Sequence, residues 1–143
     1  MDSTLPTALS DRLGFLLGRA HLAHREIALA ELAPLGLGPK EFGALALLVD
    51  EGPRPQGRLG ERQGIDRTTM VAVVDSLERH ELVERRRDPA DRRAYALHAT
   101  ARGRRVRARA DAAERRAEEA FLAPLAARER QTLKRLLREL LAA

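Results

Sequence analysis

Residues 64–105 constrain the fold of this 143-residue chain more than any other stretch. A Gly-Ile-Asp turn is followed by apolar residues at helical spacing from Arg67 to His80. A basic run with β-forming residues, Leu82 to Arg87, is then separated by a polar tip from a return run, Arg92 to Ala99, after which Thr100 can cap another helix. This order predicts a helix followed by a charged β-hairpin. Such a pair suits DNA, because a helix fits the major groove and a hairpin reaches the adjacent backbone or minor groove.

The basic charge of the chain is concentrated in the same stretch. Between residues 79 and 109, eleven arginines stand against four acidic residues, a formal charge of +7. The whole chain carries +5, so the remainder carries −2. A basic island on a nearly neutral body is typical of a polyanion-binding protein. The competing interpretation is compositional: only Lys40 and Lys134 of the 26 basic residues are lysine, so the arginines could be solvated surface charges.

Two motifs resemble the MarR family of winged helix-turn-helix regulators. Residues 86–93 (RRDPADRR), followed by Leu97, Thr100 and Gly103-Arg104, resemble the family's wing signature. Residues 65–69 (IDRTT), with Val74-Asp75, Leu77-Glu78 and residues 82–85 (LVER), are similar to its recognition helix and first wing strand. The resemblance extends over nearly the whole chain, because the length and the order of the predicted helices also fit.

The resemblance implies DNA-binding residues on both elements. On the recognition helix these are Arg67, Thr68, Thr69, Val71, Ala72, Ser76 and Arg79. On the wing they are Arg85, Arg86, Arg87, Asp91, Arg92 and Arg93. Arg92 or Arg93 is expected to enter the minor groove or bind phosphate, with Asp91 holding a wing arginine by a charge-assisted hydrogen bond.

This chain departs from the family's pattern at three positions. Relatives commonly carry Thr where Val71 stands and Arg where Ala72 stands, which leaves fewer polar groups here for reading base edges. Val71 can still contact a thymine methyl group. Relatives usually have Gly where Glu81 stands, so a left-handed glutamate is expected there, at a cost of roughly 1 kcal/mol.

The remaining pattern predicts a mainly α fold with a small β-hairpin wing. Besides the recognition helix, periodicity and breaking residues predict helices over residues 7–32, 39–50, 56–63, 101–121 and 127–141. We interpret residues 1–143 as a single domain. Its winged helix-turn-helix part is 39–99, and its N- and C-terminal dimerisation helices lie within 1–33 and 100–143. The dimer is expected because the apolar faces of the first and last helices lack obvious cover within the chain.

Several functional classes find no support in the sequence. No apolar run approaches the roughly 18 residues that span a membrane, and no secretion signal is visible, so a cytoplasmic protein is expected. The absence of cysteine excludes disulfides and thiol redox sensing. His21 and His24 lie three residues apart without a third ligand at suitable spacing, so neither a metal nor a cofactor is expected. No catalytic motif is present, and no enzyme is predicted.

These observations predict a homodimeric, sequence-specific transcriptional regulator that binds pseudo-palindromic duplex DNA. The family resemblance further implies a repressor relieved by a small aromatic or anionic ligand, held between the dimerisation helices and the wing domain. The ligand-binding residues expected for this chain are Phe15, Arg19, His21, His24, Phe42 and Leu45. Two alternatives remain open at this point. One is a sequence-tolerant architectural DNA-binding protein, suggested by Val71 and Ala72, and the other is a helical protein–protein adaptor whose arginines only increase solubility.

Overall fold

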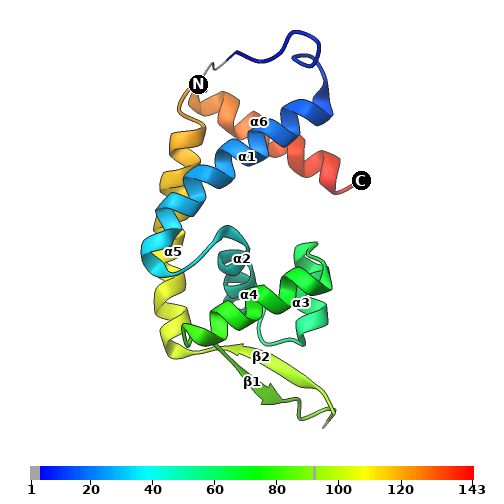
Figure 1. The fold of residues 1–143 in the computed structure, drawn as a ribbon, viewed down its shortest axis with the longest axis vertical. Coiled ribbons are helices and arrows are strands. Elements are labelled where there is room, and N and C mark those ends of the chain that lie inside the picture. The colour runs from blue at the N-terminus through cyan, green and yellow to red at the C-terminus, as the bar shows by residue number, and fades with distance from the viewer. Residues whose placement is uncertain (1–3, 92) are drawn as a thin grey trace.

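The computed structural model describes residues 4–91 and 93–143. Its elements fall into two groups, and the long helix α5 runs from one group to the other (Figure 1). The first group contains α1 (Leu13–Leu32), α5 (Ala101–Phe121) and α6 (Ala127–Leu141). The second contains η1 (Ala33–Leu35), α2 (Pro39–Asp50), α3 (Gln56–Gln63), α4 (Arg67–Arg79), β1 (Val83–Arg87) and β2 (Tyr95–Ala99). The predicted fold class, mainly α with a β-hairpin wing, is confirmed.

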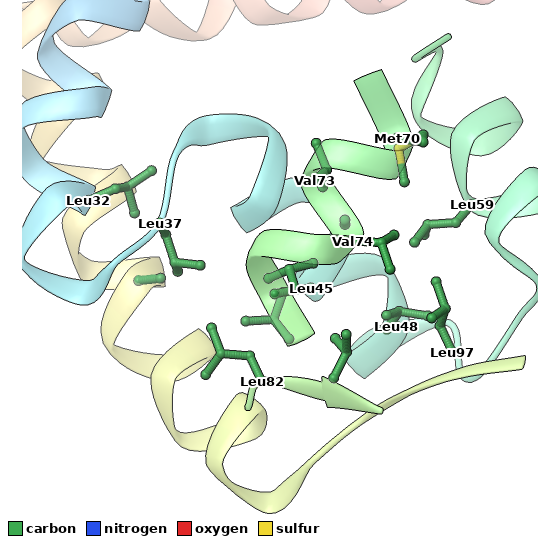
Figure 2. Packing of buried hydrophobic residues seen from close by; sticks show 14 of the residues in the cluster. Leu32, Leu37, Leu45, Leu48, Leu59, Met70, Val73, Val74, Leu82 and Leu97 are labelled. Atoms are coloured by element: carbon green, nitrogen blue, oxygen red, sulfur yellow. The ribbon is translucent and has the colours of Figure 1, made fainter. Parts of the chain in front are cut away.

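The hydrophobic core is built around α2, which is apolar on most sides. Leu45 and Leu48 of α2 belong to one buried cluster with Leu59 of α3, Val74 of α4 and Leu97 of β2 (Figure 2). Each fully buried leucine contributes about 1.5–3 kcal/mol relative to an exposed one. The core therefore ties the helix-turn-helix and the hairpin to a single central helix.

The wing is a two-stranded antiparallel hairpin with a short third-strand contact. Its register runs from Val83 opposite Ala99 to Arg87 opposite Tyr95. Arg54, in the loop before α3, makes a bridge to Leu97 through two backbone hydrogen bonds of 2.9 and 3.3 Å. The middle of β2 is thereby attached to the loop before α3.

The strands are shorter than the sequence pattern predicted. The return strand begins at Tyr95 instead of Arg92, and the first strand begins at Val83 instead of Leu82. At the tip the amide of Asp91 donates to the carbonyl of Asp88 and the amide of Ala94 donates to the carbonyl of Asp91, so these amides serve turns instead of the ladder. Arg92 itself lies outside the described residues.

The first helix also starts later than predicted, at Leu13 instead of Thr7. Residues 7–11 form turns in which Leu9 donates to the carbonyl of Pro6 and the Ser10 hydroxyl donates to the carbonyl of Thr7. Serine side chains compete with the helix in this way, which periodicity alone does not reveal. From Leu13 onward α1 packs along α5.

No single helix in residues 4–91 and 93–143 is long and apolar enough to cross a membrane. The segment Leu13–Leu35 and α2 reach the length and apolar composition of a membrane span only when they are taken together. The chain bends by 67° between them.

Candidate nucleic-acid interface

Helix α4 separates its residues cleanly into an inner and an outer face. Met70, Val73, Val74 and Leu77 are buried in the core. The exposed residues of the helix are Arg67, Thr68, Val71, Ala72, Asp75 and Arg79, while Thr69 and Ser76 are half-buried. The helix therefore presents a mixed polar and apolar face to the outside, with an arginine near each end.

The first turn of α4 is fixed by its N-cap residue, Asp66. One carboxylate oxygen of Asp66 accepts the backbone N–H of Thr69 at 2.9 Å, and the other accepts the Thr69 hydroxyl at 2.7 Å. These hydrogen bonds hold the pKa of the Asp66 carboxyl below its ordinary value, the backbone N–H of Thr69 being the largest cause. The Thr69 hydroxyl is engaged by the cap, whereas the adjacent Thr68 faces outward.

The turn between α3 and α4 is formed by Gly64, whose φ of +71° suits glycine. The two helices approach closely at Gly60, where an added Cβ would lie 2.9 Å from the Met70 side chain and 3.1 Å from the carbonyl of Ile65. An open depression of about 530 Å³ lies between them, lined in part by Gln56, Glu61, Arg67 and Val71. This packing fixes the angle of α4 within the helix-turn-helix.

The arginines of β1 are each held by a neighbouring side chain. Nε of Arg85 donates to Glu78 of α4 at 2.8 Å, and Nε of Arg86 donates to Glu84 at 2.8 Å. The guanidinium carbon of Arg87 lies 5.8 Å from the centroid of the Tyr95 ring on β2. The Arg85–Glu78 pair ties the wing to the last turn of the outward-facing helix.

The wing tip is shaped by its two aspartates. Asp88 accepts the backbone N–H of Ala90 at 2.9 Å, and Asp91 accepts the backbone N–H of Arg93 at 3.0 Å. Asp91 was expected to hold a wing arginine through its side chain. For Arg93 the bond observed here is to the backbone, while Arg92 lies outside the described residues. Arg93 is exposed beside the tip.

The link from α4 to the wing contains the expected left-handed glutamate. Glu81 has a φ of +58°, and its carbonyl accepts the Thr100 hydroxyl at 2.7 Å. The same Thr100 oxygen accepts the backbone N–H of Gly103, which confirms Thr100 as the cap of α5. One side chain thus joins the end of the outward-facing helix to the start of α5.

The residues expected to bind a ligand are only partly brought together. His21 and His24 line a hollow of about 490 Å³ between α1 and the start of α2, together with Arg25, Lys40 and Glu41. Phe15 and Arg19 lie on earlier turns of α1 and do not line this hollow. Phe42 packs against the core, and Leu45 is 0% exposed within it, so neither residue lines the hollow. Among the described residues no group of three metal-ligating side chains is assembled.

Two residues of this interface were not predicted from the sequence. Glu78 was recognised only as part of the family motif, although it binds Arg85. Tyr95 was assigned no role, although it faces Arg87 across the hairpin. The predicted run bounds would not have paired Arg87 with Tyr95, because the return strand begins three residues later than the sequence pattern indicates.

A helix-turn-helix with an outward-facing second helix, joined to a basic β-hairpin, defines a winged-helix DNA-binding protein. The comparisons with known proteins agree: a sequence profile of the MarR family matches residues 35–94. A relative from Thauera aromatica, described as a putative transcriptional regulatory protein for the hcr operon, is 34% identical over 93% of this chain and 81% of its own length. This chain belongs to the MarR family of transcriptional regulators.

Two solved structures extend the comparison to nearly the full chain. The transcriptional repressor CouR, bound to a 23-mer DNA duplex, is 37% identical with a TM-score of 0.86, covering 96% of this chain and 99% of that one. The PcaV regulator from Streptomyces coelicolor, in complex with its natural ligand, is 32% identical with a TM-score of 0.79, covering 98% and 99%. Family membership favours DNA binding over the helical adaptor that composition alone left open.

The cap at Asp66 gives a pH-dependent prediction. Because the folded-state pKa of Asp66 lies below its ordinary value of 3.8, the ionised cap stabilises the fold above that value. This contribution is lost as the pH falls through the folded-state pKa. Asp66→Ala should therefore lower Tm at pH 7, and the difference from wild type should shrink in acid.

The matched control is Asp66→Asn, which keeps an oxygen that can accept the Thr69 amide but does not titrate. Thermal melts of the three proteins between pH 7 and pH 3 measure the effect. An unchanged Tm for Asp66→Ala at pH 7 would contradict the assignment of this cap, as would a difference that persists unaltered in acid.

Proposed function

We propose that this regulator binds a pseudo-palindromic duplex as a homodimer, with one α4 helix in each of two major grooves. The observation that carries the proposal is the exposed face of α4 beside a basic hairpin, both held by one core. The two recognition helices of such a dimer must lie about one helical turn apart, roughly 34–36 Å.

Within each half-site, Arg67, Thr68, Val71, Ala72 and Ser76 face the base edges of the major groove. Arg79 and the wing residues Arg85, Arg86, Arg87, Arg92 and Arg93 bind phosphate or enter the minor groove. Phosphate contacts set the register on the duplex and carry no sequence information. Thr69 acts mainly through its hydrogen bonds to Asp66.

A sequence-tolerant architectural protein is the second candidate, and one observation favours it. Val71 and Ala72 occupy the middle of the exposed face of α4, where they offer no hydrogen bond to a base. Competition by random duplex separates the two candidates. A sequence-specific regulator keeps its operator bound in excess random DNA, whereas an architectural protein exchanges it freely.

The dimer is supported by the surface of the single chain. The chain exposes 10,123 Å², whereas a compact monomer of its mass, 15.9 kDa, exposes about 7,400 Å². Many of the exposed large hydrophobic residues lie on α1 (Leu13, Leu16, Leu17, Leu22) and α6 (Leu136, Leu140, Leu141). In Figure 1 these helices lie at the opposite end of the molecule from the hairpin. A second copy that buries them would leave both wings free for DNA.

Replacing Leu136 and Leu140 together with Glu should weaken the dimer, because two charges would enter an apolar interface. Leu140 is 65% exposed in the single chain, so the same change should not disturb the fold of the monomer. Light scattering should give two chains per particle for wild type and one for the variant, and tight DNA binding should be lost with the dimer. A single chain for wild type at micromolar concentration would contradict the proposal.

The DNA contacts predict two separable classes of variant. Arg93→Ala should cost about 1–3 kcal/mol of binding free energy on every sequence, and it should lower the slope of log affinity against log salt by about one unit for each phosphate that is no longer neutralised. Thr68→Ala should change which base pairs are preferred while leaving that slope intact.

The matched control for Arg93→Ala is Arg128→Ala, which removes the same charge from the exposed start of α6. Fluorescence anisotropy at several salt concentrations, with a selected operator and a random duplex, measures all three variants. Equal losses for Arg93→Ala and Arg128→Ala would show that only net charge matters, which would count against a wing contact.

We propose further that a small aromatic or anionic ligand binds in the hollow between α1 and α2. Imidazole and cationic groups of His21, His24, Arg25 and Lys40 line it beside apolar residues, which suits a carboxylate. The ring of His24 also contacts Phe121 of α5 edge-to-face, at 5.6 Å between centroids. The hollow thus lies between α1 and the DNA-binding part, and one of its lining residues also contacts α5. A ligand there drives release only if it binds the spacing that is incompetent for DNA more tightly than the competent one.

Aromatic carboxylates should therefore raise Tm and weaken operator binding, whereas the amides of the same acids should do neither, because they lack the charge. A thermal-shift screen followed by anisotropy with each hit measures both effects. An acid that stabilises the protein but leaves DNA affinity unchanged would contradict this mechanism. No hit among the acids would favour a hollow filled only by side chains and solvent.

A further inference from the structure

Tyr95 is the single tyrosine of the chain, and it stands on the wing without a role in the core. It is 50% exposed at the first position of β2. Its cross-strand partner is Arg87, the last residue of β1, and the guanidinium carbon of Arg87 lies 5.8 Å from the ring centroid. At this distance a cation and an aromatic face attract each other.

The alternation of the strands determines which way this pair faces. Val83, Arg85 and Arg87 occupy one face of β1, and their partners on that face are Ala99, Leu97 and Tyr95. This face is buried at the base of the hairpin through Val83 and in the middle through Leu97. In its middle, Arg85 binds Glu78 of α4. The pair of Arg87 and Tyr95 therefore lies on the side of the wing that looks toward α4, at the point where the face becomes exposed.

That position lies between the two parts of the DNA-binding surface. α4 is assigned to the major groove and the wing tip to the adjacent minor groove, and the phosphate backbone separates these grooves. The hairpin projects beyond the helices, as Figure 1 shows, and Arg87 and Tyr95 are both exposed in the described chain. A backbone passing from one groove to the other meets the face that carries Arg87 and Tyr95.

The chemistry of the pair suits phosphate. A ring beneath the guanidinium restricts its orientation, and the N–H groups lie in the guanidinium plane, from which they can donate to an anion. The phenol adds a neutral hydrogen-bond donor at the far end of the ring. One residue can thus orient a charged donor and supply a second donor to the same anion.

We propose that Tyr95 is a DNA-contact residue that positions Arg87 for a phosphate and donates its own hydroxyl to the same stretch of backbone. This inference rests on the proposed DNA-binding function. It adds an aromatic residue to the basic residues of the wing, and this residue determines how well one arginine binds phosphate.

Four variants separate the hydroxyl, the ring and the charge. Tyr95→Phe keeps the ring and loses the hydroxyl, so operator affinity should fall about tenfold with an unchanged salt slope, because a neutral donor releases no counterion. Arg87→Gln should lower the slope by about two units for a dimer, one for each phosphate that Arg87 no longer neutralises. Tyr95→Leu should lower affinity further than Tyr95→Phe and move the slope toward that of Arg87→Gln. The double variant Tyr95→Leu/Arg87→Gln should then lose less than the sum of the two single losses.

A structural role alone predicts a different outcome. If Tyr95 only stabilises the hairpin, Tyr95→Leu would lower Tm while the salt slope stayed at the wild-type value, and Tyr95→Phe would bind like wild type. Melting curves of all four variants, with Arg128→Gln as the charge-matched control on α6, distinguish these cases. Wild-type affinity for Tyr95→Phe together with a wild-type slope for Tyr95→Leu would overturn the proposal.

The sole tyrosine also allows a direct readout. Incorporating 3-fluorotyrosine into the full chain gives one fluorine resonance, and saturating operator should shift it. A resonance that does not move while the operator is bound would overturn the Tyr95 contact and leave the DNA-binding function standing. If no duplex is bound at any salt concentration, the proposed function itself fails, so the two failures are distinguishable.

Discussion

The structure depends on a close approach of two backbones, at Gly103 in α5 and Leu82 after α4. A Cβ at Gly103 would overlap the carbonyl oxygen of Leu82, so only glycine permits α5 to begin this near the wing. Thr100 closes the same junction, because its amide donates to Leu82 at 3.0 Å and its hydroxyl donates to the carbonyl of Glu81. The recognition helix, the wing and the long helix α5 therefore meet at one point. A movement of α5 at this junction would therefore act on both DNA-binding elements.

An ion-pair cluster at the end of α2 also connects α5 to the DNA-binding part. Arg107 of α5 binds Asp50 through two hydrogen bonds of 2.6 and 2.8 Å and also binds Asp111. The bonds to Asp50 raise the pKa of Arg107 above its ordinary value, and Arg107 lowers the pKa of Asp50. Asp50 is exposed, so the pair adds orientation more than stability. The ligand that we propose between α1 and α2 would change the angle of the DNA-binding part relative to the α1–α5 unit. The separation of the two recognition helices would change with it.

Much of the fold could be predicted because its signals are local. The caps at Asp66 and Thr100, the turn at Gly64 and the left-handed Glu81 each follow from a few neighbouring residues and the family motif. What could not be predicted depends on residues distant in sequence. The pairing of Arg85 with Glu78 requires the wing to lie against α4, and the complete burial of Leu45 results from packing by several elements, which removes it from the hollow that His21 and His24 line. The predicted start of α1 was wrong for a different reason. Hydrogen bonds within residues 6–12 form turns there, although the apolar periodicity favours a helix. The DNA-binding roles and the dimer remain predictions, since they concern molecules outside this chain.

In the dimer that we propose, two copies of the helix-and-wing unit bind one face of a duplex. Hydroxyl-radical footprinting of the purified protein on an operator isolated from its own genome tests this most directly. A homodimer of this kind should give protection that is symmetric about a dyad, with the centres of the two half-sites separated by about one helical turn, roughly 10–10.5 base pairs. Within each half-site the backbone on both sides of a major groove and of the adjacent outer minor groove should be protected. A single asymmetric protected segment, or uniform protection without a dyad, would contradict the account.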